Sequence, residues 1–240
     1  MERNQNQESS NNRQTVKSNP IGYIQLDSGL KAIEVMNDIF TNYHFEKKEY
    51  WEDLRSIANI FICGYASECP ETLLEPIEGE ISVETQYIRF KDPDKKTDRQ
   101  DFKLTNKKIT FMELQNKAYT DPPIEERATG YYGMGIAHGG GKITNQMWLM
   151  AEDLRSVMHS RKYMNYILTD EQTGIKYPKS SGILFVSLTK ISEDNSAAGE
   201  LARFLIGKTA DVESIKDSSV KAIATGLNEG FGVFKEDKSS

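Results

Sequence analysis

The chain has 240 residues, of which 38% are hydrophobic and 10% aromatic, and its formal net charge is −6. This length suits one sizeable core, since cores stop growing only beyond about 250 residues. No window approaches the roughly 18 continuous apolar residues of a membrane span, and the N-terminus lacks the apolar segment of a signal peptide. We therefore expect a cytoplasmic protein with no membrane partner. Because non-specific nucleic-acid binders are commonly basic, the acidic balance argues mildly against a duplex-coating protein, but not against an enzyme that meets DNA through one basic patch.

The first part of the chain predicts a polar tail followed by helices. Residues 1–20 are mostly Asn, Gln and Ser, and such a segment cannot offset its ordering entropy, so we predict a disordered tail. Apolar residues at roughly helical spacing predict helices over 28–43 and, more clearly, over 46–63. Cys63 and Cys69 are the only cysteines and have no histidine nearby, which favours reduced thiols over a disulfide or a zinc site.

From residue 81 the apolar period changes to two. Alternation over 81–90 predicts a strand, and two more short strands, 101–104 and 109–115, follow after polar turns. Short strands separated by such turns indicate an antiparallel meander.

The remainder mixes helices and strands. The pattern predicts two helices, over 124–137 and 145–160, and then two strands, over 163–170 and 182–191, around the turn EQTG. Two final helices are predicted over 196–207 and 212–226.

The residues that suggest chemistry lie on the second and third strands of the meander. Asp101 begins one strand and Glu113 and Gln115 end the next, so a hairpin sets the two acids side by side. Glu113 and Gln115 are two residues apart and share a face. Two carboxylates with an amide carbonyl beyond them form a hard oxygen site suited to Mg²⁺ or Mn²⁺. The alternative is that both acids are solvated residues at strand ends.

Other catalytic patterns are missing from the sequence. The histidines His44, His138 and His159 lack the spacing of metal ligands, and no G-x-S-x-G motif supports acyl transfer by a serine.

From Asp101 onward the order of features resembles the PD-(D/E)XK nuclease family transposases, a bacterial group of restriction-endonuclease-like proteins. The likeness rests mainly on 101-DFKL, 109-ITFMELQ-115 and 127-RATGYY-132, with Gln115 in place of the Lys that names the wider superfamily. It extends more weakly over roughly residues 30–210.

The weaker likeness comes from segments on both sides. They are 37-NDIFTNY-43, the turn in 163-YMNYILTDEQTG-174 and the Leu-x-Lys strand in 183-ILFVSLTK-190. Family members usually carry a hydrophobic strand between the Arg-Tyr-Tyr helix and the Thr-Gly turn. Here that interval reads as helical, so we expect this strand to be short, near 148-WLM-150, or lost.

The resemblance implies an α/β fold: a restriction-endonuclease-like core with a mixed central sheet flanked by helices, over 21–210, followed by a C-terminal helical extension and polar tail over 211–240. It implies a metal-dependent DNA endonuclease associated with transposition or recombination. Asp101 and Glu113 would bind Mg²⁺ (or Mn²⁺), and Gln115 would orient the attacking water or the scissile phosphate. On this interpretation the strand end that carries Glu113 and Gln115 is open to substrate.

Several roles stay open at this point. Asp98 competes with Asp101 as the first acid, and Asp38 leans toward the site from the first helical region. Arg127 contacts a phosphate or forms a surface salt bridge with Glu125 or Glu126. The tyrosines after Arg127, Tyr131 and Tyr132, are expected in the core or in the wall of a groove.

Two other classes of protein also remain open. One is a catalytically inactive nuclease-fold module that binds DNA or a protein partner. The other is an α/β protein of a mobile element or of host–phage conflict, unrelated to nucleases. The sequence also leaves open whether the chain forms a homodimer.

Overall fold

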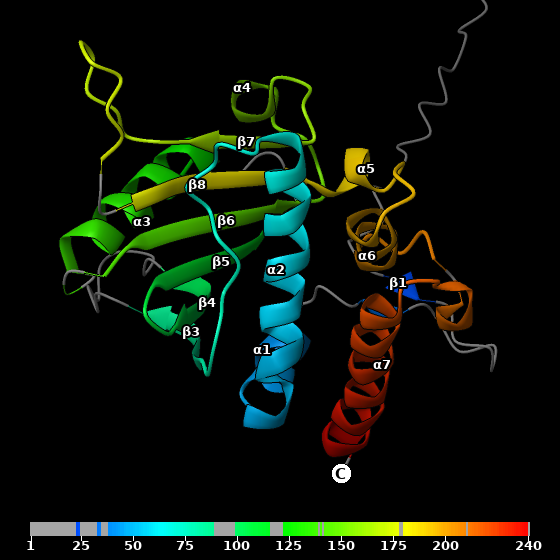
Figure 1. Ribbon diagram of the computed structural model, residues 1–240. Helices are drawn as coiled ribbons and strands as arrows, with labels where there is room; N and C mark the ends of the chain where they lie inside the picture. Colours follow the sequence, from blue (N-terminus) through cyan, green and yellow to red (C-terminus); the bar gives the residue numbers. More distant parts are fainter. Residues whose placement is uncertain are drawn as a thin grey trace, which may run out of the picture.

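The computed structural model describes residues 23–24, 33–34, 38–88, 99–115, 122–138, 140, 142–177, 180–209 and 211–239 (Figure 1). The predicted tail over 1–20 and the competing acid Asp98 lie outside these residues. The architecture is α/β, with a mixed sheet of six strands and helices on both of its faces.

The elements have the following bounds. The strands are β1 (Tyr23–Ile24), β2 (Ile33–Glu34), β3 (Ser82–Ile88), β4 (Arg99–Thr105), β5 (Ile109–Gln115), β6 (Thr144–Met150), β7 (Tyr163–Tyr166) and β8 (Ser180–Ser187). The helices are α1 (Asp38–Phe45), α2 (Trp51–Glu68), α3 (Ile124–His138), α4 (Arg155–Met158), α5 (Leu188–Ile191), α6 (Ala197–Leu205) and α7 (Ser218–Ser239), with short 3₁₀ turns η1 (Lys48–Tyr50) and η2 (Val212–Ser214).

The large sheet has the order β3-β4-β5-β6-β8-β7. Strands β3, β4 and β5 form the predicted antiparallel meander, which is confirmed. Strand β6 pairs parallel with β5 and with β8, and β7 closes the sheet antiparallel to β8. Every residue of β5 and β6 is buried, as expected for the middle of a sheet covered on both faces.

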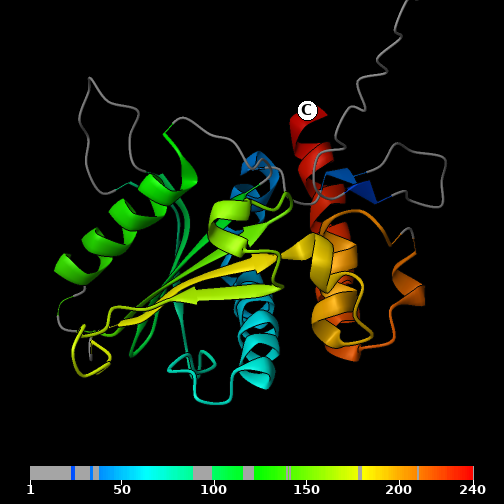
Figure 2. The same cartoon turned by 90° about the horizontal axis from the view of Figure 1, so that it is seen from above.

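Helices cover both faces of this sheet (Figure 2), and a hydrophobic cluster lies on each face. The larger cluster joins α1, α2, α6 and α7 to alternate residues of the strands, among them Met112 and Leu149. The smaller cluster joins α3 and α4 to the strand residues that point to the other face, among them Trp148 and Phe185. Since side chains alternate along a strand, Glu113 and Gln115 share the face that α3 covers.

Two predicted helices are wrong. The segment 145–160 contains β6, the strand that we expected to be short or lost, and only its last part forms the short α4. A strand buried on both faces has no alternation of polar and apolar residues, so its run QMWLM cannot be told from a helix by period. In the predicted helix over 28–43, Ile33 and Glu34 form β2, and the described helix is only Asp38–Phe45.

Other predictions hold with shifted ends. The helices over 46–63 and 124–137 correspond to α2 and α3, and both cysteines are free thiols, as predicted. The predicted strand over 182–191 ends at Ser187, where the Ser187 side chain accepts a hydrogen bond from the Lys190 amide and starts α5. No described helix combines the length and apolar character needed to cross a membrane.

Packing between α1 and α7 centres on His44. Its ring is fully buried, stacks on Tyr50 at 3.8 Å between centroids and contacts the edge of Phe45. Neither ring nitrogen has a hydrogen-bond partner within the described part of the chain. Burial, with a smaller electrostatic effect of Lys47, lowers the pKa of His44 from 6.5 to about 4. The imidazole is therefore neutral in the folded protein at pH 7.

We predict that His44 makes the protein sensitive to mild acid. Its folded-state pKa lies below the ordinary value, so the unfolded chain binds the proton first as the pH falls below 6.5, and folding is destabilised between pH 6.5 and 4. Urea unfolding gives the free energy of unfolding of His44→Phe and of the wild type. The value for the variant minus the value for the wild type should rise by about 2 kcal/mol between pH 7 and pH 4.5. His159→Asn, at an exposed histidine, should keep the wild-type pH dependence. Identical curves for His44→Phe and the wild type would contradict the prediction.

A second prediction uses two glycines of α7. A Cβ added at Gly230 would overlap the His44 ring, whereas one added at Gly232 would meet no described atom within 4 Å. Gly230→Ala should therefore cost about 1–3 kcal/mol of unfolding free energy, while Gly232→Ala should stabilise by up to about 1 kcal/mol through helix propensity. Thermal or urea unfolding measures both, and adding His44→Ala should relieve most of the cost at Gly230. Equal effects of the two glycine substitutions would argue against close packing of α7 on His44.

Candidate active site at the end of the β4–β5 hairpin

The β4–β5 hairpin brings Asp101 and Glu113 together. Regular pairing runs from Thr105 with Ile109 to Phe102 with Met112, and one more step along this register sets Asp101 opposite Glu113. Beyond the last regular pair, an Asp101 Oδ2 accepts a hydrogen bond from the Leu114 amide at 2.8 Å. This bond ties the Asp101 side chain to the strand that carries Glu113. The Asp101 carboxylate therefore lies at the backbone of the residue that follows Glu113.

Arg127 of α3 contacts the other two predicted site residues. Its Nη1 donates to Gln115 Oε1 at 3.1 Å, and its Nη2 lies 3.5 Å from Glu113 Oε2. The Glu113 side chain is 3% exposed and that of Arg127 21%. Because a buried carboxylate is costly without compensating charge, Arg127 provides both an ion pair and a donor at this position.

Aromatic rings hold the Arg127 guanidinium in place. Its Cζ lies 5.8 Å from the ring centroid of Tyr131 and 5.2 Å from that of Trp148. The two rings stack on each other at 6.1 Å between centroids. Arg127 therefore combines an ion pair with cation–π contacts. Tyr131 and Tyr132 are buried in the cluster beneath α3, as predicted.

Residues of β6 complete the surroundings of the site, and they were not expected there because the sequence predicts a helix over 145–160. With its amide oriented to satisfy both neighbours, Gln146 donates to the Ala128 carbonyl at 3.0 Å and accepts from Trp148 Nε1 at 2.9 Å. These bonds link β6 to the turn of α3 that carries Arg127. The run 144-TNQMWLM-150 has no alternation of polar and apolar residues, so the sequence carried no periodic signal for this strand.

Three expectations about the site are corrected. The strand end is not open, since Glu113 and Gln115 are only 2% and 8% exposed and lie against Arg127. The ion-pair partner of Arg127 is Glu113, so the surface bridge to Glu125 or Glu126 is not the one formed.

The third correction concerns Asp38, which the structure does not bring to the site. It begins α1, whose buried residues Phe40 and Phe45 belong to the cluster on the opposite face of the sheet.

A further cation on the site's face comes from β4. Lys103 lies two residues after Asp101, so both side chains leave the strand on the same face. Its Nζ is 2.7 Å from Glu84 Oε1 on the neighbouring strand β3. The meander therefore carries alternating charges across this face, with Glu84, Lys103 and Glu113 on three successive strands.

The donor set fits a hard divalent cation. Asp101 and Glu113 supply carboxylate oxygens and Gln115 an amide carbonyl, and Mg²⁺ typically takes one or two carboxylates and fills its other positions with water and substrate phosphate. The described residues contain no group of three or more His, Cys, Asp or Glu side chains placed to hold a metal. Within the described part of the chain, the candidate site has the two carboxylates of Asp101 and Glu113, and Arg127 already interacts with one of them.

Comparison with protein-family models, with curated proteins and with solved structures gives no match to this chain.

We predict that Arg127 and Glu113 are energetically coupled. Arg127→Met should lower the unfolding free energy by about 2–4 kcal/mol, because the buried carboxylate loses its cation. In the double variant Arg127→Met/Glu113→Gln, the loss should be smaller than the sum of the single losses by about 1–2 kcal/mol. Urea unfolding of the four proteins in the cycle measures this coupling. Additive losses would mean that the 3.5 Å ion pair contributes nothing to stability.

Proposed function

We propose that the chain is a metal-dependent DNA endonuclease with a restriction-endonuclease-like core, associated with transposition or recombination. The observation that carries the proposal is the hairpin that joins Asp101 to the strand end with Glu113 and Gln115, where Arg127 contacts both of these side chains. Paired carboxylates beside an arginine suit a phosphodiester substrate, because the acids hold a divalent ion and the guanidinium pairs with phosphate oxygens.

The order of elements supports the proposal. The strand that Asp101 starts, the strand that ends in Glu113 and Gln115, and the helix with Arg127 appear as β4, β5 and α3. The buried strand that the resemblance calls for next is present as β6. The Thr-Gly turn follows, where Asp170 Oδ1 accepts from the Thr173 amide and hydroxyl at 2.8 and 2.7 Å.

Each side chain has a definite part in the proposed reaction. Asp101 and Glu113 would hold Mg²⁺ (or Mn²⁺), which when bound lowers the pKa of a water ligand and offsets charge on the phosphate. Gln115 offers an amide that orients water or a phosphate oxygen. Arg127 pairs with the substrate phosphate once Glu113 engages the cation, and its partial exposure gives it access to substrate.

A second candidate is an inactive nuclease-fold module that binds DNA or a protein partner. The burial of Glu113 and its ion pair with Arg127 favour it, because in this arrangement Arg127 itself provides the charge compensation that a metal would give. The two candidates differ in whether a divalent cation displaces Arg127 from Glu113.

We predict that isosteric changes of the two acids abolish cleavage without unfolding the protein. In Asp101→Asn the amide oxygen still accepts the Leu114 N–H, and in Glu113→Gln the amide still accepts from Arg127. Both variants lose the ligand charge, so Mg²⁺-dependent cleavage of DNA should fall by at least about 100-fold, a loss of about 2.7 kcal/mol in transition-state stabilisation. Cleavage assays with circular DNA, together with Mg²⁺ and Mn²⁺ titration calorimetry with and without DNA, measure both consequences.

The matched control is Glu126→Gln, an exposed acid on α3 that faces neither Asp101 nor Glu113 and should leave cleavage unchanged. Wild-type rates in Glu113→Gln would show that these acids are not the catalytic pair. A folded wild-type protein that binds DNA but neither cleaves it nor takes up a divalent ion would establish the second candidate instead.

A further inference from the structure

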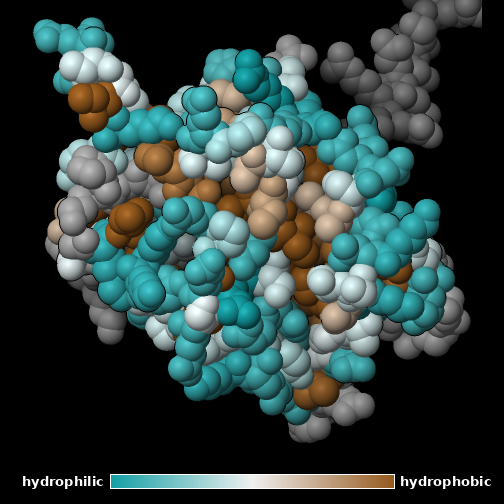
Figure 3. All heavy atoms as spheres, in the orientation of Figure 1, coloured by the Kyte–Doolittle hydropathy of each residue, from teal (hydrophilic) through white to brown (hydrophobic). Residues whose placement is uncertain are grey.

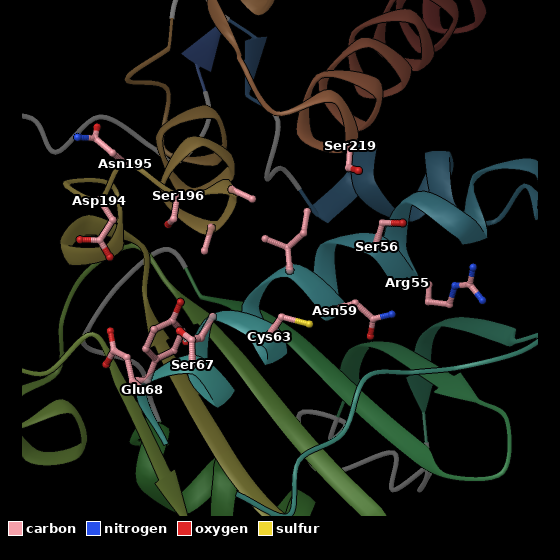
Figure 4. Close-up of a pocket in the computed structure, with 15 residues that line it drawn as sticks. Arg55, Ser56, Asn59, Cys63, Ser67, Glu68, Asp194, Asn195, Ser196 and Ser219 are labelled. Carbon is pink, nitrogen blue, oxygen red and sulfur yellow. Dashed lines mark hydrogen bonds between the residues drawn. The ribbon is translucent and has the colours of Figure 1, made fainter. Parts of the chain in front are cut away.

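A pocket lies on the side of α2 that faces away from the sheet, and it belongs to the face opposite α3. It has a volume of about 770 Å³ and is formed by α2, the start of α6 and β7. Figure 4 shows Cys63, Ser67 and Glu68 of α2 across from Asp194, Asn195 and Ser196, which precede α6. On the surface, apolar residues run along the middle of this side of the molecule and polar residues border them (Figure 3).

Tyr163 lines this pocket with a hydroxyl that lacks a protein partner. The residue is 6% exposed, and no hydrogen bond joins its hydroxyl to any group in the described part of the chain. Burial, with the nearby carboxylates of Glu68 and Asp194, raises the pKa of Tyr163, so the hydroxyl stays protonated and can donate. The hydroxyl faces the pocket, so a ligand or water there can accept its hydrogen bond.

The start of α6 presents two further donors to the same pocket. Ser196 caps the helix by accepting from the Gly199 amide at 3.1 Å, and the Glu200 amide bonds to the Ser196 carbonyl. The amides of Ala197 and Ala198 have no hydrogen-bond acceptor among the described residues. Amides in the first turn of a helix point along its axis, where the helix dipole favours negative charge.

The hydroxyl and the helix start converge at Gly64. A Cβ added there would overlap the Tyr163 hydroxyl and would lie 3.4 Å from the Ala198 Cβ. Gly64 thus lets the Tyr163 hydroxyl and the Ala198 methyl group approach α2 closely at the edge of the pocket.

The charges that border the pocket are largely paired. Lys162 Nζ lies 2.7 Å from Asp194 Oδ1 and 4.0 Å from Glu68 Oε1. Arg55, at the other end of the pocket, contacts Glu52 and the Gly79 carbonyl. Lys162 thus offsets one of the two carboxylates, those of Glu68 and Asp194, that lie near Tyr163.

We propose that this pocket binds a small ligand through an oxyanion, a carboxylate or a phosphate, held by the Tyr163 hydroxyl and the Ala197 and Ala198 amides. The apolar side chains of Ile60, Ala197 and Ala198 line the pocket beside these donors and pack against the ligand's body. The site lies on the opposite face of the sheet from Asp101 and Glu113, and it does not depend on the proposed endonuclease activity.

The test measures how fast the exposed thiol of Cys63, which lines the pocket, reacts with an alkylating reagent. In the full chain carrying Cys69→Ser, the rate of Cys63 alkylation by N-ethylmaleimide is measured with inorganic phosphate, with benzoate and with the uncharged benzamide. We expect saturable protection by phosphate or by benzoate, and none by benzamide. Tyr163→Phe removes only the unpartnered hydroxyl, so it should fold normally and weaken the protecting anion about tenfold.

Tyr177→Phe is the matched control, because Tyr177 is exposed and does not line the pocket, and it should bind like the parent protein. Protection by phosphate alone would identify phosphate compounds as the ligand class, and protection by benzoate alone would identify organic acids. Absence of protection by both anions at tens of millimolar, or equal protection in Tyr163→Phe, would overturn the proposal.

Discussion

The carboxylate of Glu113 lies in the interior of the sheet, and a buried carboxylate is tolerated only when positive charge and hydrogen bonds compensate for lost hydration. Arg127 meets this need from α3, and the same guanidinium bonds to Gln115 and lies over Trp148. The position of α3 on the sheet is therefore coupled to the chemistry of the strand beneath it. The Gln146 bonds to α3 and to Trp148 tie β6 into the same arrangement.

The two proposed functions differ in what happens to this ion pair. If Glu113 stays paired with Arg127, the ion pair is a structural element of the core. If a divalent ion takes Glu113, the guanidinium becomes available to an anion such as a phosphate. On the endonuclease proposal, the free energy of the ion pair decides how much binding energy a metal must provide.

The two faces of the sheet separate two kinds of site. The face under α3 carries charged side chains that compensate one another near Asp101 and Glu113. The helices on the other face leave a pocket whose donors near Gly64 lack protein acceptors. The connections between the parallel strands β5, β6 and β8 place α3 and α4 on one face of the sheet. The segments before β3 and after β8 place α1, α2, α6 and α7 on the other face.

The sequence alone determined the local features. Alternation and polar turns indicated β3, β4 and β5, and the hairpin implied by two short strands set Asp101 beside Glu113 before any tertiary contact was known. Helical spacing likewise indicated α2 and α3, since an amphipathic stripe is a property of consecutive residues. Only the tertiary structure decided that 144–150 is a central strand, because burial on both faces removes the alternation that marks a strand. It also decided that Arg127 pairs with Glu113, and that Tyr163 meets the start of α6 at Gly64. These contacts join distant segments, and their geometry depends on how helices pack on the sheet, which no local pattern encodes.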